Sequence, residues 1–324
     1  PTWRPNEDFR YSYPMRDVDN YRQLLMEEEA LARAVEAGDE ATTASWAAAA
    51  HAIRHQRTAK LAKEHREFEI ALELQEGTAV YMGRSTLGTA GETVRLREER
   101  GPEGIRWRCY ETGATVAVLL DRLLPVWKTL LDEEPEITFA QLLERALNTR
   151  EIEPATFTDE DLSTLASRAE TAIADLAAER KALYDSFDGR GRRVVIRLED
   201  TSDFLEMTRF DPMAVEILNN GEALQAHNLT AVHSRGEINF VNPHFVRRSL
   251  DGALALTTPA GEHPFLDGFR RVAISGFAGE PTVTRDGYAV TLEAEGLTVQ
   301  FDAAQVESND GEIIVTVSPA EDPR

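Results

Sequence analysis

The feature that most constrains the fold of this chain is a change in the spacing of its apolar residues near Gly189. Before this point apolar residues recur every three or four positions, which is typical of amphipathic helices. After it they occur in short β-branched runs bounded by Gly, Asn, Asp or Pro, which is typical of strands. The sequence therefore predicts an α+β protein, with a helical unit over residues 1–189 and an antiparallel β-rich domain over residues 190–324.

The helical unit is expected to contain helices over residues 17–37, 39–61, 64–82, 112–133 and 138–147, and a last helix that ends before Gly189. Asp39 and Thr138 stand where helix N-caps are expected. Thr158 and Asp161 have the spacing of a capping box for the last helix. Pro125 is expected to kink the fourth helix, because proline lacks the backbone N–H and clashes with the preceding turn.

The β-rich domain is expected to contain strands over residues 193–198, 229–232, 238–241, 253–257, 271–275, 288–293, 297–301 and 313–317. Short strands of this kind favour a small sheet, a sandwich or a partial barrel. If residues 234–237 form the turn of a hairpin, His227 and His244 face each other with their Cβ atoms about 5 Å apart. Such a pair can share a metal ion, and the alternative is a purely structural histidine pair.

The charge of the chain excludes one class of partner. It has 35 Lys and Arg against 57 Asp and Glu, a net charge of −22. Nucleic acid is bound by cationic side chains that release its counterions, so we expect no binding of nucleic acid through a charged surface. No apolar run approaches the roughly 20 residues that cross a bilayer. The lone Cys109 excludes an internal disulfide and a cysteine metal cluster.

Residues 69–81, Glu-Ile-Ala-Leu-Glu-Leu-Gln-Glu-Gly-Thr-Ala-Val-Tyr, carry the most chemical information. Glu69, Glu73 and Glu76 are spaced i, i+4 and i+7, so they share one helix face. Three carboxylates on one face repel each other unless cations or a metal neutralise them. Either this face is solvated, with its charge offset by the basic residues of segment 63–66, or it belongs to a metal site.

The motif Glu-Gly-x-Ala-x-Tyr at residues 76–81 resembles the glutamate helix of gluzincin-type zinc peptidases. In those enzymes one helix bears HExxH, and a later helix supplies the third zinc ligand. The chain is also similar to a group of uncharacterised bacterial metallopeptidase-like proteins. That wider similarity lies in the segments 21–35, 54–57, 69–81, 110–114, 119–127 and 210–212.

This resemblance implies that the helical unit is zincin-like, that zinc is the cofactor and that a peptide or protein is the substrate. By the match at residues 69–81, Glu76 is the third zinc ligand. Glu73 is an acid that does not bind the zinc ion itself but interacts with the residues that do. We expect both to face a groove, with Tyr110 or Tyr81 close by. Tyr110 is the candidate catalytic residue.

The sequence departs from this pattern because it contains no HExxH. His51 and His55 have the i, i+4 spacing of a zinc pair, but Ala52 follows His51 where the general-base glutamate belongs. We interpret this pair as part of the face of an alanine-rich helix. In the similar proteins HExxH precedes the segment 21–35, so we expect it before Pro1, in a chain that has been processed or trimmed. A periplasmic or secreted location is favoured over a cytoplasmic one.

Two hypotheses follow. In the first, the chain is a zinc-metallopeptidase-like protein that hydrolyses peptide bonds only if an HExxH helix is supplied from outside this segment. In the second, it is a non-catalytic binding or assembly protein, a pseudopeptidase that uses the β-rich domain as its contact surface. Zinc content separates them, because the first requires about one bound zinc ion per full-length chain.

Overall fold

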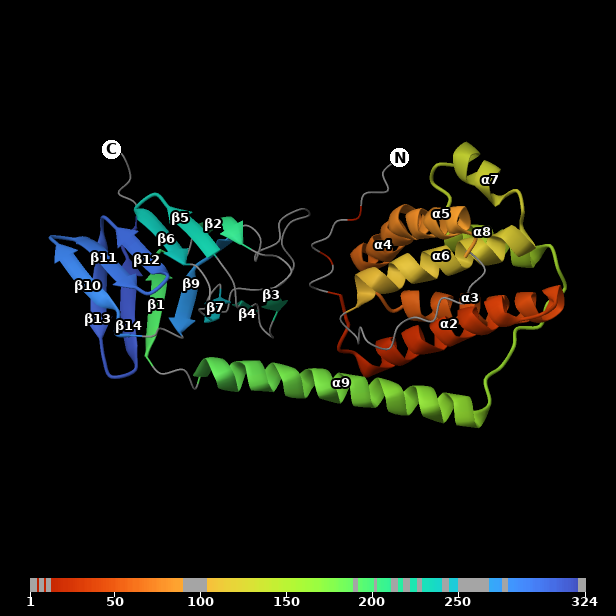
Figure 1. Ribbon diagram of the computed structural model, residues 1–324, viewed down its shortest axis with the longest axis horizontal. Helices are drawn as coiled ribbons and strands as arrows, with labels where there is room; N and C mark the ends of the chain where they lie inside the picture. The colour runs from red at the N-terminus through yellow and green to blue at the C-terminus, as the bar shows by residue number, and fades with distance from the viewer. Residues whose placement is uncertain are drawn as a thin grey trace. The chain divides into compact units, whose positions relative to one another are not determined.

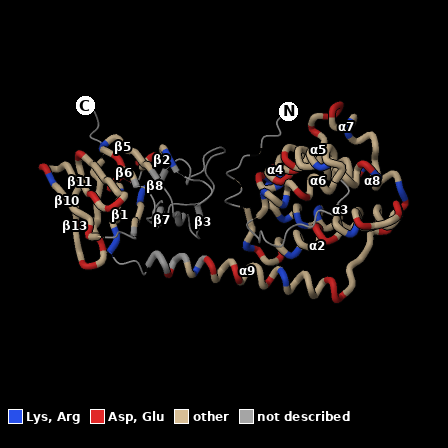
Figure 2. Tube along the Cα trace, viewed as in Figure 1, with Lys and Arg blue, Asp and Glu red and all other residues tan. Residues whose placement is uncertain are grey.

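The computed structural model describes Pro5, Phe9 and residues 13–89, 104–188, 192–200, 203–210, 215–217, 222–225, 229–240, 245–249, 268–275 and 279–319 (Figure 1). Helices come first and strands follow, so the predicted α+β class is confirmed. The chain divides into two compact units, Pro1–Glu179 and Arg180–Arg324. Acidic and basic residues are interspersed along the described elements of both units (Figure 2).

The helices are α2 (Val18–Glu36), α3 (Glu40–Thr58), α4 (Lys63–Leu72), α5 (Thr78–Leu87), α6 (Ile105–Leu123), α7 (Trp127–Glu133), α8 (Phe139–Asn148) and α9 (Asp159–Asp188). A π-helical turn, η1 (Glu73–Gly77), joins α4 to α5. None of the helices in the described part of the chain is long and apolar enough to cross a membrane.

Several helix starts form as predicted. Asp39 caps α3 by accepting a backbone N–H in its first turn. At α8 the Thr138 hydroxyl accepts the N–H of Gln141, and the Gln141 side chain accepts the N–H of Thr138. Thr158 and Asp161 make the same reciprocal pair at α9. These caps satisfy N–H groups that the helix itself leaves without partners.

Other helix boundaries differ from the prediction. The helix that was expected to start at residue 112 begins at Ile105, and it ends at Leu123. Pro125 therefore ends this helix and does not kink it, and α7 starts two residues later. Leu124 takes an extended conformation, with φ −147° and ψ 71°, as the residue before a proline commonly does. The third predicted helix continues through Gly83 to Leu87.

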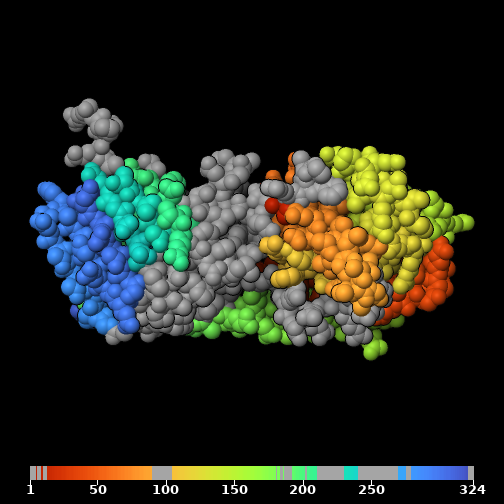
Figure 3. All heavy atoms as spheres, turned by 45° about the horizontal axis from the view of Figure 1, so that its top comes forward, coloured from red at the N-terminus to blue at the C-terminus, as the bar shows by residue number. Residues whose placement is uncertain are grey.

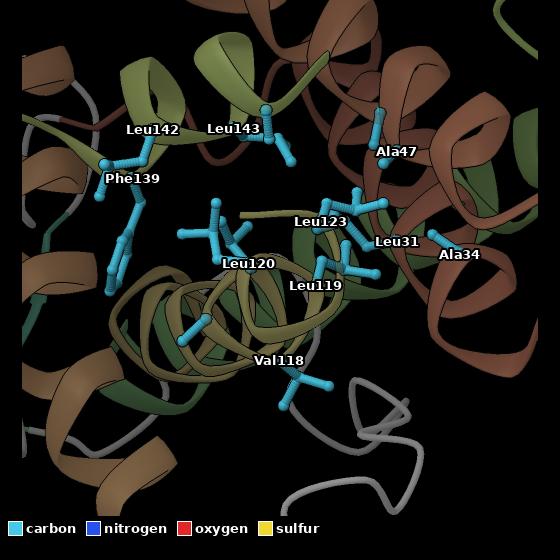
Figure 4. Packing of buried hydrophobic residues seen from close by; sticks show 14 of the residues in the cluster. Leu31, Ala34, Ala47, Val118, Leu119, Leu120, Leu123, Phe139, Leu142 and Leu143 are labelled. Atoms are coloured by element: carbon cyan, nitrogen blue, oxygen red, sulfur yellow. The ribbon is translucent and has the colours of Figure 1, made fainter. Parts of the chain in front are cut away.

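Helix α6 runs through the middle of the helical core (Figure 4). Its side chains at Leu119, Leu120 and Leu123 are almost fully buried. They meet residues of α2, α3 and α8, among them Leu31, Ala47, Phe139, Leu142 and Leu143. The alanines of α3 keep that helix close to its neighbours, since small side chains let backbones approach.

The β unit contains two seven-stranded sheets with the orders β13-β14-β1-β9-β7-β4-β3 and β10-β11-β12-β6-β5-β2-β8. The strands of the first sheet are β1 (Arg193–Leu198), β3 (Val215–Ile217), β4 (Glu222–Gln225), β7 (Phe245–Ser249), β9 (Arg271–Ser275), β13 (Ala304–Ser308) and β14 (Glu312–Val317). Those of the second are β2 (Leu205–Phe210), β5 (Leu229–His233), β6 (Gly236–Phe240), β8 (Gly268–Phe269), β10 (Thr282–Asp286), β11 (Ala289–Ala294) and β12 (Leu297–Phe301).

Among the described strands all pairs are antiparallel except β1 with β14, which is parallel. One apolar cluster contains residues of both sheets, such as Ile196 and Val315 from the first and Leu292 and Val299 from the second. The two sheets therefore form a sandwich around a shared core.

The predicted strands 193–198, 271–275 and 297–301 match β1, β9 and β12, and 253–257 lies outside the described residues. The prediction missed β2, β3, β4, β7 and β8, and it also missed the edge strands β10 and β13. Both are largely exposed and polar, so they lack the apolar alternation that identifies a half-buried strand.

The predicted hairpin register was wrong. Strands β5 and β6 pair His233 with Gly236 and Ala231 with Ile238, so only two residues form the turn. A Cβ atom at Gly236 would lie 1.8 Å from the backbone oxygen of Gln300, and this close strand approach explains the glycine there. The register that was expected to set His227 opposite His244 is therefore not the one that forms. Both histidines lie outside the described residues.

Candidate functional site

A buried network of charged side chains lies at the centre of the helical unit. Arg54 of α3 holds both carboxylate oxygens of Glu73, each at 2.7 Å. Arg57, one turn later, holds both oxygens of Glu69, again at 2.7 Å. Bidentate pairs of this kind fix geometry as well as charge. Glu69 also accepts the hydroxyl of the buried Tyr13.

Glu27 of α2 joins three arginines in this network. Its carboxylate lies 2.6 Å from Arg54, 3.1 Å from Arg57 and 2.9 Å from Arg108 of α6. Burial by itself would raise the pKa of Glu27, but these guanidiniums outweigh it and hold that pKa well below its usual range. The pKa of Glu69 is lowered in the same way, against its burial, chiefly by Arg57.

The network also contains a fourth carboxylate, that of Glu28. Glu28, whose side chain is 15% exposed, lies 3.0 Å from Arg108 and is the fourth acid, after Glu27, Glu69 and Glu73. The guanidiniums of Arg54, Arg57 and Arg108 lie in the network, and the charge of Arg168 on α9 also acts on Glu28. Burial, together with the neighbouring Glu27 carboxylate, raises the pKa of Glu28 to about 7. Glu28, in a place that water hardly reaches, therefore retains a proton up to about neutral pH.

The charges of Glu69 and Glu73 are neutralised inside the helical unit and not by solvent. The expectation of a solvated face, offset by the basic residues of segment 63–66, is wrong for these two acids, since both are buried. Their counter-ions come from α3 instead, through Arg54 and Arg57. Glu73 also accepts the hydroxyl of Thr112 at 2.7 Å, which ties it to α6.

The π-helical turn η1 separates Glu76 from Glu73. In an α-helix, residues three apart lie nearly above each other, whereas the wider π turn spreads them further around the axis. The turn packs directly on α6, because a Cβ atom at Gly113 would lie 2.6 Å from the backbone oxygen of Glu73. A Cβ atom at Gly77 would lie 2.7 Å from the Cα of Gly113. The two glycines therefore allow a backbone contact that no other residue type permits.

Glu76 lies at the edge of this contact, and its side chain is 30% exposed. Its oxygen Oε1 is 3.7 Å from Nη2 of Arg106, in the first turn of α6. Nε of Arg106 donates a hydrogen bond of 2.6 Å to the hydroxyl of Tyr110. The ring of Tyr110 in turn packs edge-on against Trp107, with centroids 5.2 Å apart. We call Glu76, Arg106 and Tyr110 the Glu76 cluster.

The other motif tyrosine, Tyr81, belongs to a different set of contacts. Its hydroxyl donates to Asp121 at 2.5 Å and accepts from Lys128 at 2.7 Å. The indole of Trp127 donates to the second oxygen of Asp121 at 2.9 Å. These bonds join α5, α6 and the start of α7. Of the two tyrosines expected near Glu76, Tyr110 is the one in the Glu76 cluster.

Metal-ligand geometry is not complete among the described residues, where no group of three or more His, Cys, Asp or Glu side chains is placed to hold an ion. His55 is exposed, and His51 is half-buried beside a small cavity lined by Glu27 and Arg54. Burial lowers the pKa of His51, so its imidazole is neutral at pH 7. Neutral imidazole is the form that binds metal ions, but the described residues place no third ligand with these two histidines.

Sequence reasoning missed Glu27, Arg106 and Arg108 as members of these clusters. The signal for Arg54 and Arg57 was present, because both belong to a segment that carries the resemblance. Comparison of the chain with protein-family models, with curated proteins and with solved structures yields no match.

Proposed function

We propose that this chain is a zinc-peptidase-like protein, and that its helical unit supplies Glu76 as one metal ligand. The supporting observation is the difference between the three acids of segment 69–81. Glu69 and Glu73 are buried, and each is held by an arginine through both oxygens. Glu76 is partly exposed, and its ion pair with Arg106 is long, at 3.7 Å. Its carboxylate, which also interacts with the Tyr110 hydroxyl, is the one of the three that no arginine holds through both oxygens.

Glu73 and Glu76 differ in how well they suit a zinc ion. Glu76 has the right chemistry for a ligand, since carboxylate oxygens bind zinc at about 2.0–2.2 Å. Glu73 does not fit as a ligand, because Arg54 and Thr112 occupy its oxygens. It fits instead as the residue that fixes the turn from which Glu76 projects. The described residues thus offer one ligand, and the proposal requires an HExxH helix from outside them.

A bound zinc ion would polarise the scissile carbonyl and lower the pKa of its bound water. Tyr110 is the candidate hydrogen-bond donor to the substrate, because it lies in the same cluster as Glu76. A positioned donor of this kind stabilises negative charge that develops on a substrate oxygen. The substrate class under this proposal is a peptide or protein.

The test measures zinc by elemental analysis after dialysis, in the protein expressed from its complete reading frame. We expect about one zinc per wild-type chain. Glu76→Ala should lose most of this zinc and keep its fold by circular dichroism, since alanine is a good helix former. Glu67→Ala, on the exposed face of α4, is the matched control and should keep its zinc.

Equal zinc in wild type and Glu76→Ala would remove Glu76 from the site. No zinc in any of the three proteins would favour the second hypothesis, a non-catalytic protein that uses its β-rich domain for binding.

A further inference from the structure

The first half of α9 packs on α2, and one face of α2 is turned toward it. Tyr21, Leu25 and Glu28 are spaced i, i+4 and i+7, so they share that face. Leu25 is buried together with Leu165 and Ala169 of α9, and Tyr21 packs on the same cluster. Helix α9 therefore covers the face of α2 that carries Glu28 (Figure 1).

The charges that act on Glu28 place its carboxylate at this contact between α2 and α9. Burial raises the pKa of Tyr21, the Glu28 carboxylate raises it further, and Arg168 of α9 lowers it, so the three side chains lie near one another. On its other side Glu28 meets Nε of Arg108 at 3.0 Å, and its side chain is 15% exposed. The charged or titratable groups that act on Glu28 from α2, α3, α6 and α9 are Tyr21, Glu27, Arg57, Arg108 and Arg168.

Few contacts hold α9 to the rest of the helical unit. Among the α9 side chains that the structure describes, only Leu165, Ala169 and Leu176 are buried. At the start of the helix, Arg33 holds both oxygens of Asp161, at 2.6 and 3.1 Å. Part of α9 is visible at the surface, in green, in Figure 3. A helix with so small a buried face opens at a lower free-energy cost than the core, because local opening is cheapest where few apolar contacts are lost.

We propose that the docking of α9 on α2 is sensitive to pH: Glu28 loses its proton as pH rises, and its charge then loosens α9 beyond the Arg33–Asp161 pair. This inference is independent of the proposed function. A carboxylate that α9 covers is less stable charged than neutral, and Arg168 offsets only part of that cost, because burial is the largest influence on Glu28. When α9 moves away, water reaches Glu28 and solvates the charge.

The direction and size of the effect follow from the pKa of Glu28. This pKa is about 7 with α9 docked, and we expect it to return toward 4.5 when α9 opens. A pKa that is raised in the docked state favours docking fully below the undocked pKa, and this contribution is lost as pH rises through about 7. The open fraction of α9 should therefore rise about tenfold between pH 6 and pH 8, and level off at higher pH.

The test is maleimide labelling of Ala169→Cys in the full-length protein, since residue 169 is buried and reacts only when α9 opens. At each pH its rate is divided by that of Ala174→Cys, on the exposed face of α9, which cancels the ionisation of the thiol. This ratio should rise about tenfold from pH 6 to pH 8. Adding Glu28→Gln should abolish the rise. Adding Glu29→Gln, the matched control, should leave the rise unchanged, because that side chain is 37% exposed in its pair with Arg33.

The native Cys109, fully buried in the helical unit, distinguishes opening of α9 from opening of the whole unit. Peptide mapping should find Cys109 unlabelled while residue 169 reacts, and labelling of both in step would overturn the inference. A ratio that does not change with pH, or a rise that persists with Glu28→Gln, would overturn it as well. If Ala169→Cys does not fold, hydrogen exchange of the amides of residues 162–173, in proteins that keep Ala169, makes the same comparison against peptides of α6.

Discussion

Replacing Glu28 by Gln should make the helical unit more stable at alkaline pH. Glu28 is the acid of the buried network whose pKa is raised, and it lies 3.0 Å from Nε of Arg108. The charges that act on it are those of Arg108, Glu27, Arg168 and Arg57. A glutamine has the same shape and retains an oxygen that can accept from Arg108, but it carries no charge. The substitution therefore removes the carboxylate whose pKa burial raises, and leaves the other ion pairs of the network in place.

The magnitude follows from the pKa of Glu28, which rises from 4.5 to about 7 in the folded protein. A raised pKa in the folded state means that the contribution of this group to stability is complete below the unfolded pKa and is lost as pH rises through about 7. At about 1.4 kcal/mol per pKa unit, the whole loss is about 3 kcal/mol, and about 2 kcal/mol of it falls between pH 5 and pH 8. Glu28→Gln removes this loss, so its stability relative to wild type should increase by about 2 kcal/mol over that interval.

Urea denaturation followed by tryptophan fluorescence measures this difference. All four tryptophans, Trp3, Trp46, Trp107 and Trp127, precede residue 180, so their emission reports on the helical unit. Glu67→Gln is the control, because that side chain is 61% exposed and should change stability by the same small amount at every pH. A Glu28→Gln variant that tracks wild type from pH 5 to pH 8, or that falls below it at pH 8, would refute the reasoning about a buried carboxylate with a raised pKa.

Two further predictions concern the packing and the division of the chain. Gly113→Ala should destabilise the helical unit by at least about 1–3 kcal/mol in the same urea assay, because its Cβ would lie 2.6 Å from a backbone oxygen. Gly83→Ala, with open space around it, should instead stabilise by about 0.4–1 kcal/mol, and equal effects would contradict the proposed backbone contact. Limited trypsin digestion should cut first between Asp188 and Arg192, where the sequence places two glycines between the helical and strand patterns. An initial cut elsewhere, with this joint intact in the product, would contradict the predicted boundary.

The order of elements could be predicted because it depends on local signals. The caps at Asp39, Thr138 and Thr158 use side chains within three residues of the helix start. The change of apolar period near Gly189 is likewise a local property of the sequence. The edge strands β10 and β13 were missed because an exposed strand lacks the alternation of apolar and polar residues that identifies a half-buried one. Such a strand is recognised only by its hydrogen bonds to the neighbouring strand.

The state of the acids in segment 69–81 could not be predicted, because their partners are distant in sequence. Arg54 precedes Glu73 by 19 residues and Arg57 precedes Glu69 by 12. Helical spacing indicates that the acids share a face, but not which helix covers it. The π turn is also a tertiary effect, since it forms where the backbone of η1 meets Gly113 of α6.

The residues that carry the resemblance to zinc peptidases fall into two groups, those that packing explains and those that it does not. Gly77 and Gly113 are required where two backbones touch, and Tyr81, Asp121 and Trp127 bond one another across a helix break. Packing therefore accounts for most of the motif residues, and any helical protein with this local geometry could carry them without peptidase activity.

Glu76 is different from these residues. Its side chain is 30% exposed, its ion pair with Arg106 is long at 3.7 Å, and alanine would suit the helix at that position at least as well. Because packing does not explain a glutamate at this position, a functional role is the better explanation for it. For this reason the zinc content of Glu76→Ala tests the proposed function more sharply than any substitution elsewhere in the motif.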